Sequence, residues 1–143
     1  MDLTNADLAN TGLTKKVALV TGASGDIGGA IARCLAAQGA NVILTYVGAA
    51  EIAAQLAVDI EQAGGTAWAV QLDQRDPEAI EALMHQVAAK YGCLDILINN
   101  AAWNIGIPFP NLDELTVDIW DRVLETNLRA PFLLARAGAK LLK

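Results

Sequence analysis

Short apolar runs alternate with longer amphipathic stretches along most of the chain, and glycine or proline separates them. The runs are four to seven residues long and rich in Val, Ile and Leu, which is typical of strands that are buried on both faces. They predict four strands, at Val17–Val20, Asn41–Val47, Thr66–Leu72 and Leu94–Ile98.

The stretches between these runs predict helices. Ala-rich Ile27–Gln38 ends at Gly39, and Ala49–Ala63 places Ile52, Leu56 and Ile60 four apart on one face. Asp76 and Pro77 form a strong helix start, as N-cap and first helical residue, for a helix that runs to Tyr91. Two further helices are expected, one capped by Thr116 and one over Leu128–Lys143 with Pro131 near its first turn.

Strands that alternate with helices predict an α/β fold with parallel pairing and right-handed crossovers. The expected architecture is a Rossmann-like, doubly wound parallel sheet with strand order 3-2-1-4. Residues 15–143 are predicted to form one domain, preceded by a flexible arm over residues 1–14.

Composition and charge narrow the function classes. The net charge is −6 at pH 7, which argues against a nucleic-acid partner. No apolar run is long enough for a membrane span, and the first residues do not resemble a secretory signal, so a cytoplasmic protein is expected. His85, Cys34 and Cys93 are scattered, and no metal site is predicted.

The most informative segment is the glycine-rich turn between the first strand and the first helix. Gly22, Gly25 and Gly28 lie in the sequence VALVTGASGDIG, Val17–Gly28. Backbone N–H groups at a helix N-terminus bind phosphate, and a side chain in the turn would hold the phosphate away. The triad inside a β-α-β unit therefore predicts a site for the pyrophosphate of a dinucleotide; a tight turn without a ligand is the alternative.

The chain resembles the short-chain dehydrogenase/reductase family over nearly all of Lys15–Lys143, and most of all the 3-oxoacyl-[acyl-carrier-protein] reductase type. Thr21–Gly28 is similar to the cofactor turn of the family, and Asn99-Asn100-Ala101-Ala102 is similar to its NNAG stretch, with Ala102 in place of glycine. Asp73 matches the residue that touches the adenine ring, and Asn127 matches the asparagine of the catalytic tetrad.

The resemblance implies an NAD(P)-dependent oxidoreductase that interconverts a carbonyl and an alcohol, with Asn127 as a catalytic residue that helps hold a water. The implied cofactor-binding residues are Thr21, Gly22, Ser24, Gly25, Asp26, Ile27, Gly28, Thr45, Tyr46, Leu72, Asp73, Asn99, Asn100 and Ala101.

The remaining catalytic residues of the family, a serine and a Tyr-x-x-x-Lys pair, are not found in these 143 residues. Tyr46 and Tyr91 are the only tyrosines, and Ala50 and Asp95 stand four residues after them. The chain is therefore interpreted as the cofactor-binding half of the fold, truncated before this pair. The alternative is a non-catalytic dinucleotide-binding module. With its next strand absent, the apolar edge of Leu94–Ile98 predicts a homo-oligomer or a missing C-terminal half as partner.

Two positions bear on cofactor affinity and choice. Asp26 stands where the commonest branch of the family has glycine; it either repels the pyrophosphate or caps the helix and is partly neutralised by the helix dipole. The second strand ends in Thr45-Tyr46-Val47-Gly48, without the acidic residue that favours NAD. With hydroxyls from Ser24, Thr45 and Tyr46 available, the sequence leans to NADP over NAD. The resemblance implies a small carbonyl or alcohol as the substrate, and the sequence does not assign its identity.

Overall fold

The structure, a computed structural model, describes residues 12–142 of the chain. Most of the arm predicted over residues 1–14 lies outside this range. The elements are β1 (Val17–Val20), α2 (Asp26–Ala37), β2 (Asn41–Tyr46), α3 (Ala50–Gln62), β3 (Thr66–Gln71), α4 (Pro77–Tyr91), β4 (Ile96–Ile98), the 3₁₀ segment η1 (Phe109–Glu114), α5 (Val117–Leu124), the π-helical turn η2 (Glu125–Arg129) and α6 (Ala130–Gly138).

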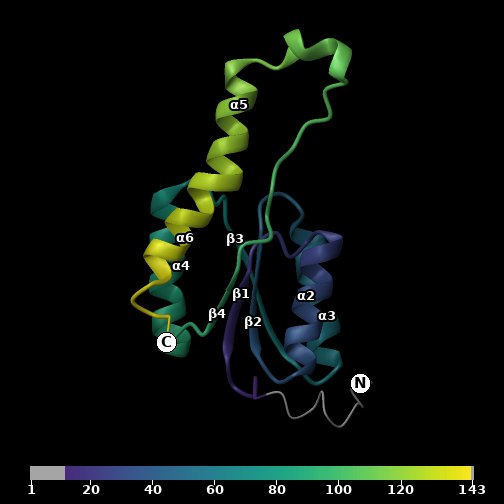
Figure 1. Cartoon of the computed structure of the whole chain (residues 1–143). Helices are drawn as coiled ribbons and strands as arrows, with labels where there is room; N and C mark the ends of the chain where they lie inside the picture. Colours follow the sequence, from purple (N-terminus) through teal and green to yellow (C-terminus); the bar gives the residue numbers. More distant parts are fainter. Residues whose placement is uncertain (1–11, 143) are drawn as a thin grey trace, which may run out of the picture.

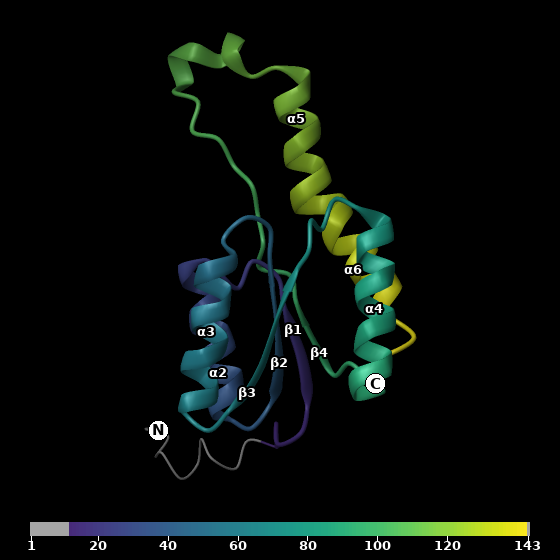
Figure 2. The ribbon, with the colours of Figure 1, turned by 180° about the vertical axis from the view of Figure 1, so that it is seen from behind.

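The four strands form one parallel sheet in the order β3-β2-β1-β4, which confirms the predicted topology. β1 is central and pairs with both neighbours, Ala18 lying opposite Val42 of β2 and Ile96 of β4. Helices α2 and α3 cover one face of the sheet, and α4 and α6 cover the other (Figures 1 and 2). The result is a three-layer α/β arrangement.

Alternate residues of β1 supply the two hydrophobic cores. Val17 and Leu19 pack in the core beneath α4 and α6, while Ala18 and Val20 pack in the core beneath α2 and α3. All four are at most 2% exposed. Because successive strand residues point to opposite faces, a strand buried on both sides has to be apolar throughout, as the sequence pattern indicated.

The helix boundaries follow the predicted caps, and one predicted face is wrong. Asp76 Oδ1 accepts hydrogen bonds from the backbone N–H of Glu78 and Ala79 at 2.9 and 3.2 Å, and Gly92 ends α4 in the left-handed conformation. In α3 the buried residues are Ala53, Leu56 and Ile60, whereas Ile52 is 58% exposed. A helix has 3.6 residues per turn, so the stripe drifts and begins one residue later than Ile52.

The last helical region differs from the prediction of two separate helices. α5, η2 and α6 follow one another without a break from Val117 to Gly138, and α6 ends there instead of at Lys143. Pro131 is the second residue of α6, but helical residues precede it, so its missing N–H affects the hydrogen bonding of the turn before it. Within residues 12–142 no helix combines the length and the apolar character required to span a membrane.

One strand is shorter than predicted. The last predicted strand, Leu94–Ile98, is reduced to Ile96–Ile98 in the structure.

Asp95, just before β4, makes two hydrogen bonds to the start of β1. Its carboxylate accepts hydrogen bonds from Lys16 Nζ and from the Val17 N–H, each at 2.8 Å. Both bonds lower the pKa of Asp95, the Lys16 ammonium most. Asp95 thus connects the start of β1 to the segment before β4, at the N-terminal ends of these strands, whereas the glycine-rich turn follows the C-terminal end of β1.

Candidate functional site

The glycine-rich turn connects the C-terminal end of β1 to α2. Gly22 has φ +63°, in the left-handed region that favours glycine. The Ala23 N–H donates to Thr45 O at 2.9 Å, which ties the turn to β2, and the Gly25 N–H donates to Gly22 O at 3.1 Å. These bonds place the first residues of α2 at the point where the strand order reverses, which is where open α/β sheets bind ligands.

The three glycines are required for different reasons. A Cβ on Gly22 would lie 3.0 Å from both Cα and Cβ of Ala101, and one on Gly28 would collide with Gly22 O and lie 2.7 Å from Asn100 Nδ2. These two glycines permit close backbone packing. A Cβ on Gly25 would meet only Gly22 O, at 3.5 Å, so the fold itself has room for a side chain there. The absence of a side chain at Gly25 keeps the adjoining cavity open.

This cavity fits a phosphate. It has a volume of about 550 Å³ and is lined by Gly22, Ser24, Gly25, Asp26, Ile27, Gly28, Val47, Gly48, Ala49, Asn100, Ala101 and Ala102. The first hydrogen bond of α2 runs from the Gly29 N–H to Gly25 O at 2.8 Å, so the N–H groups of Asp26, Ile27 and Gly28 have no acceptor within the helix. Gly25 is the N-cap and contributes no side-chain cap. Unsatisfied N–H groups beside an open cavity form an anion-binding arrangement.

Asp26 is the first residue of α2 and does not cap it, which corrects one of the two expectations for this position. Its side chain is exposed and lines the cavity. The carboxylate gains from the positive end of the helix dipole, yet it places a negative charge where an anion would bind. No lysine or arginine lines this cavity in the part of the chain that the structure describes.

Thr21 and Asn100 hold the ends of β1 and β4 together. The Thr21 hydroxyl accepts hydrogen bonds from the N–H of Asn100 and Ala101, at 3.0 and 2.9 Å. Asn100 Nδ2 donates to Thr21 O at 2.9 Å and to Gly22 O at 3.3 Å. Thr21 is 1% exposed, so its side chain cannot contact a ligand and supports the site only through these hydrogen bonds.

A second cavity, of about 210 Å³, adjoins the first one at the C-terminal ends of the strands. It shares Val47, Ala101 and Ala102 with the first cavity and is otherwise lined by Asp73, Gln74, Arg75, Trp103, Arg122 and Thr126. Together the two cavities extend from the N-terminus of α2 past the C-terminal ends of β2 and β3. An elongated groove of this kind suits a dinucleotide, with the phosphates at one end and a base at the other.

Asp73 enters this groove as an oriented carboxylate. Arg75 donates to it from Nε at 3.0 Å, from Nη2 at 2.6 Å and from its backbone N–H at 3.0 Å. The Arg75 hydrogen bonds lower the pKa of Asp73, and the charge of Arg122 adds to this effect. The Asp73 carboxylate therefore stays ionised and can only accept hydrogen bonds.

Asn127 forms two hydrogen bonds to the segment that follows β4. Its Oδ1 accepts from the Trp103 N–H and its Nδ2 donates to Trp103 O, both at 2.8 Å. The Arg122 guanidinium lies 4.1 Å from the centre of the Trp103 ring. Trp103 lines the second cavity and also stacks against Arg122.

The other predicted residues contribute in different ways. Thr45 is 2% and Leu72 3% exposed, so a ligand could reach these residues through their main chain but not through their side chains. Ser24 and Tyr46 are half-buried at the C-terminal end of the sheet, and Asn99 is exposed. Ile27 is 71% exposed and lines the first cavity. The buried Thr45 hydroxyl weakens one argument for the NADP preference.

Sequence reasoning missed Gln74, Arg75 and Arg122, all of which line the second cavity. Gln74 is 4% exposed and donates from Nε2 to two main-chain carbonyls, of Ala101 and Thr126. No spacing or motif distinguishes these three residues. The one available signal was the position of Gln74 and Arg75 directly after a predicted strand and beside Asp73.

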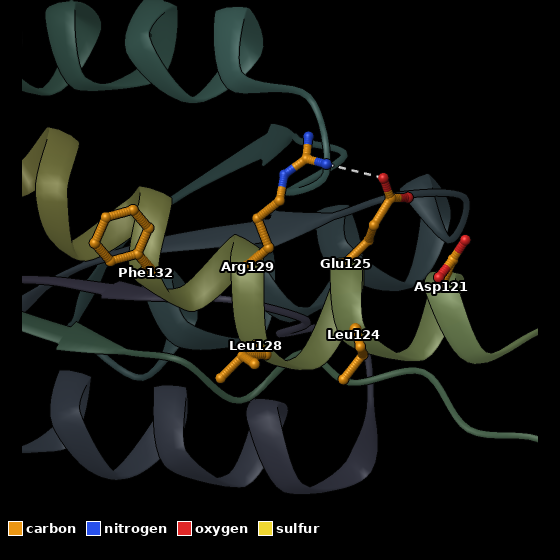
Figure 3. A pocket seen from close by; sticks show the side chains of 6 residues that line it. All are labelled: Asp121, Leu124, Glu125, Leu128, Arg129 and Phe132. Atoms are coloured by element: carbon orange, nitrogen blue, oxygen red, sulfur yellow. Dashed lines mark hydrogen bonds and ion pairs between the residues drawn. The ribbon is translucent and has the colours of Figure 1, made fainter.

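A further cavity, of about 570 Å³, is lined entirely by residues of the long helical region formed by α5, η2 and α6. Figure 3 shows Leu124 and Leu128 pointing to one side of the helix, with the ion pair of Glu125 and Arg129 on another. Leu128 is 67% and Phe132 60% exposed. Asp121 and the ion pair of Glu125 and Arg129 also line this cavity, which shares no lining residue with the groove.

Comparison with known proteins shows which family the chain resembles in sequence and in fold. A sequence model of the short chain dehydrogenase family matches residues 16–143. A 3-oxoacyl-[acyl-carrier-protein] reductase, FabG, of Staphylococcus aureus is 39% identical over 118 residues, which are 82% of this chain and 46% of that protein.

Two solved structures are similar over almost the whole chain. A dehydrogenase/reductase from Sinorhizobium meliloti 1021 matches with TM-score 0.88 and 43% identity, over 97% of this chain and 54% of that one. A short chain dehydrogenase from Burkholderia cenocepacia J2315, in complex with NADP, matches with TM-score 0.84 and 43% identity, over 91% of this chain and 52% of that one. The chain thus spans about half the length of these relatives.

Proposed function

Because the chain belongs to the short chain dehydrogenase family, we propose that it forms the dinucleotide-binding part of an NADP(H)- or NAD(H)-dependent oxidoreductase. The reaction is the interconversion of a carbonyl and an alcohol on a small molecule. The observation that carries the proposal is the N-terminus of α2, where three N–H groups without an intrahelical acceptor face an open cavity beside Gly25. The complex of the Burkholderia cenocepacia relative with NADP supports the choice of cofactor.

The residues of this chain bind and orient the cofactor, which supplies the hydride when bound. The N–H groups of Asp26, Ile27 and Gly28 hold the pyrophosphate, and Gly25 leaves room for it. Asp73, held ionised by Arg75, accepts a hydrogen bond from the amino group of adenine. Ala101 and Ala102 line both cavities and shape the wall between the two ends of the groove.

Asn127 is proposed to act beside the reacting atoms by holding the wall of the groove and a water of the proton relay. Its side-chain amide is already engaged by the main chain of Trp103. No tyrosine of the chain is followed four residues later by lysine, so the proton donor that the family resemblance implies is not among these residues. Turnover is therefore proposed for a protein of the relatives' length, to which this chain contributes the cofactor site.

A non-catalytic dinucleotide-binding module is the second candidate. It applies if the cofactor site acts without the Tyr-x-x-x-Lys pair, which these residues do not contain; they span about half the length of the relatives. This candidate predicts cofactor binding without reduction of any carbonyl. A homo-oligomeric state and a cytoplasmic location stay predictions from the sequence, and the surface around Leu128 and Phe132 is where a contact between copies should be sought (Figure 3).

The test is a calorimetric titration of the folded chain with NADPH and, separately, with NADH. We expect saturable binding of one dinucleotide per chain, with NADPH bound more tightly. Inorganic phosphate at the same concentration serves as the control for non-specific anion binding. Absence of saturable binding of either dinucleotide to a chain that circular dichroism shows to be folded would contradict the proposal. Reduction of a carbonyl by the chain alone would contradict the location of the proton donor.

A further inference from the structure

Gln74 is a buried side chain that connects two segments far apart in the sequence. It lies between β3 and α4, and its Nε2 donates to Ala101 O at 3.2 Å and to Thr126 O at 2.9 Å. Both acceptors are main-chain carbonyls, so the amide nitrogen has to face them and the orientation of the amide is defined. One glutamine thus joins the wall of the groove to the π-helical turn η2.

The carbonyl of Thr126 needs this donor because of the local helix geometry. The Ala130 N–H, which would bond to Thr126 O in an α-helix, donates to Glu125 O instead. The next residue, Pro131, has no N–H to offer. Thr126 O is therefore left without a donor from its own helix, and a buried carbonyl without a partner is costly.

The neighbouring residue of the same turn carries the side chain that contacts the groove. Asn127 makes two hydrogen bonds to the main chain of Trp103, while Gln74 holds Thr126 and Ala101. The hydrogen bonds of Gln74 and those of Asn127 therefore lie next to each other, because they involve residues 126–127 of the helical turn and residues 101–103 of the wall. A shift of the turn by one hydrogen-bond register would rotate Asn127 away from Trp103.

We propose that Gln74 is a positioning residue that fixes the π-helical turn against the Ala101–Trp103 wall, so that Asn127 keeps its place and the groove keeps its shape for the dinucleotide. This inference rests on the proposed function. The Oε1 atom of Gln74 is buried without a hydrogen-bond partner among the described residues. An unpaired buried acceptor is unfavourable, so Gln74 is a poor choice for packing alone and its donor atom accounts for its presence.

The test compares Gln74→Met, which preserves side-chain size but removes the donor, with the control Gln55→Met. Gln55 is an exposed residue of α3 whose Nε2 donates to Asp59. Amide hydrogen exchange of the full chain is followed by NMR. In Gln74→Met the Trp103 N–H should exchange at least about tenfold faster than in the unsubstituted chain, and the Leu19 N–H in the core at an unchanged rate. Gln55→Met should change neither.

The same variants are titrated with NADPH. Gln74→Met should raise the Kd for NADPH about tenfold, and Gln55→Met should leave it unchanged. Unchanged exchange at Trp103 in folded Gln74→Met would overturn the role of Gln74. Failure of the unsubstituted chain to bind NADPH would overturn the proposed function instead, while the exchange comparison would still decide whether Gln74 holds the turn.

A measurement without substitution covers the case in which Gln74→Met does not fold. In the unsubstituted chain the side-chain amide protons of Gln74 should be protected from exchange. Their resonances and the Trp103 N–H resonance should shift on NADPH addition with a single Kd. Rapid exchange of the Gln74 side-chain protons, or shifts at Trp103 without any at Gln74, would contradict the proposal.

Discussion

The two walls of the groove are built on different physical principles. The wall formed by the glycine-rich turn depends on backbone packing: a Cβ on Gly22 would lie only 3.0 Å from Ala101, and a Cβ on Gly28 would collide with Gly22 O. The adjoining wall, at Ala101–Trp103, depends on polar side chains, with Gln74 and Asn127 bonded to main-chain atoms. The first wall is held in place because its glycines have no side chains, and the other because its side chains form hydrogen bonds to the main chain.

This difference determines how each wall should respond to substitution. Steric packing fails abruptly when an atom is added, and it affects the whole fold because β1 lies at the centre of the sheet. A hydrogen-bonded wall loosens locally when a donor is removed, because the cores beneath it remain packed. Substitutions in the two walls should therefore separate effects on stability from effects on cofactor binding.

Gly28→Ala should have the largest effect on stability. The added Cβ would collide with Gly22 O and lie 2.7 Å from Asn100 Nδ2. Backbone atoms cannot yield as a flexible side chain can, so we expect the free energy of unfolding to fall by about 3 kcal/mol. Urea denaturation followed by circular dichroism measures this change. A loss below about 1 kcal/mol would show that the turn is not packed as tightly as described.

Gly25→Ala should separate binding from stability. Its Cβ would meet only Gly22 O, at 3.5 Å, and the backbone of Gly25 is extended at φ −85° and ψ 163°, which alanine adopts freely. We expect unfolding free energy to change by less than about 1 kcal/mol while the Kd for NADPH rises about tenfold or more. Calorimetry with NADPH gives the second value. Unchanged affinity would mean that the phosphate does not lie against this glycine.

Asp95→Asn tests the N-terminal ends of β1 and β4, far from the groove in the strand direction, where stability should change and binding should not. Hydrogen bonds from Lys16 and Val17 lower the pKa of Asp95, so its contribution is complete above about pH 4 and is lost as the pH falls through the lowered pKa. We expect the variant to be less stable at pH 7 by about 1–2 kcal/mol and to lose less stability on acidification. Denaturation between pH 2 and 7 measures both effects. Equal acid sensitivity of the two proteins would contradict this assignment.

Asp26→Asn should give the smallest effect, with opposite signs for binding and stability. The substitution removes a negative charge from the phosphate cavity, and NADPH affinity should rise about two- to fivefold at low salt. It also removes a carboxylate from the first turn of α2, which should lower stability by about 0.3–1 kcal/mol. Titrations at two salt concentrations provide the check, because the gain should shrink as salt is added. Weaker binding by the variant would show that Asp26 assists the cofactor.

The same contrast between the walls explains what could be predicted from the sequence. The strands, their order and the glycine-rich turn were readable, because continuous apolar runs and glycine spacing are properties of the chain itself. The cap at Asp76 and the end at Gly92 were likewise readable, since each depends on one residue and its immediate neighbours. The groove wall formed by backbone packing was therefore predicted with its residues.

The polar wall was not predictable in the same way. Gln74 forms a hydrogen bond to Thr126, 52 residues away in the sequence, and no local pattern predicts such a contact. The π-helical turn was missed because it results from Pro131 and a compensating tertiary hydrogen bond acting together. Ile52 was placed on the buried face because a strict spacing of four ignores the drift of a 3.6-residue helix.

The most direct test of the account follows both walls during one NADPH titration of the chain. Backbone amide resonances of Ser24–Gly28 report on the glycine-rich turn, and those of Ala101–Trp103 report on the polar wall. The account predicts that both sets shift with one Kd, while resonances of the apolar surface at Leu128 and Phe132 stay in place. Shifts confined to that surface, or no shifts in a folded chain, would contradict the assignment of the groove as the dinucleotide site.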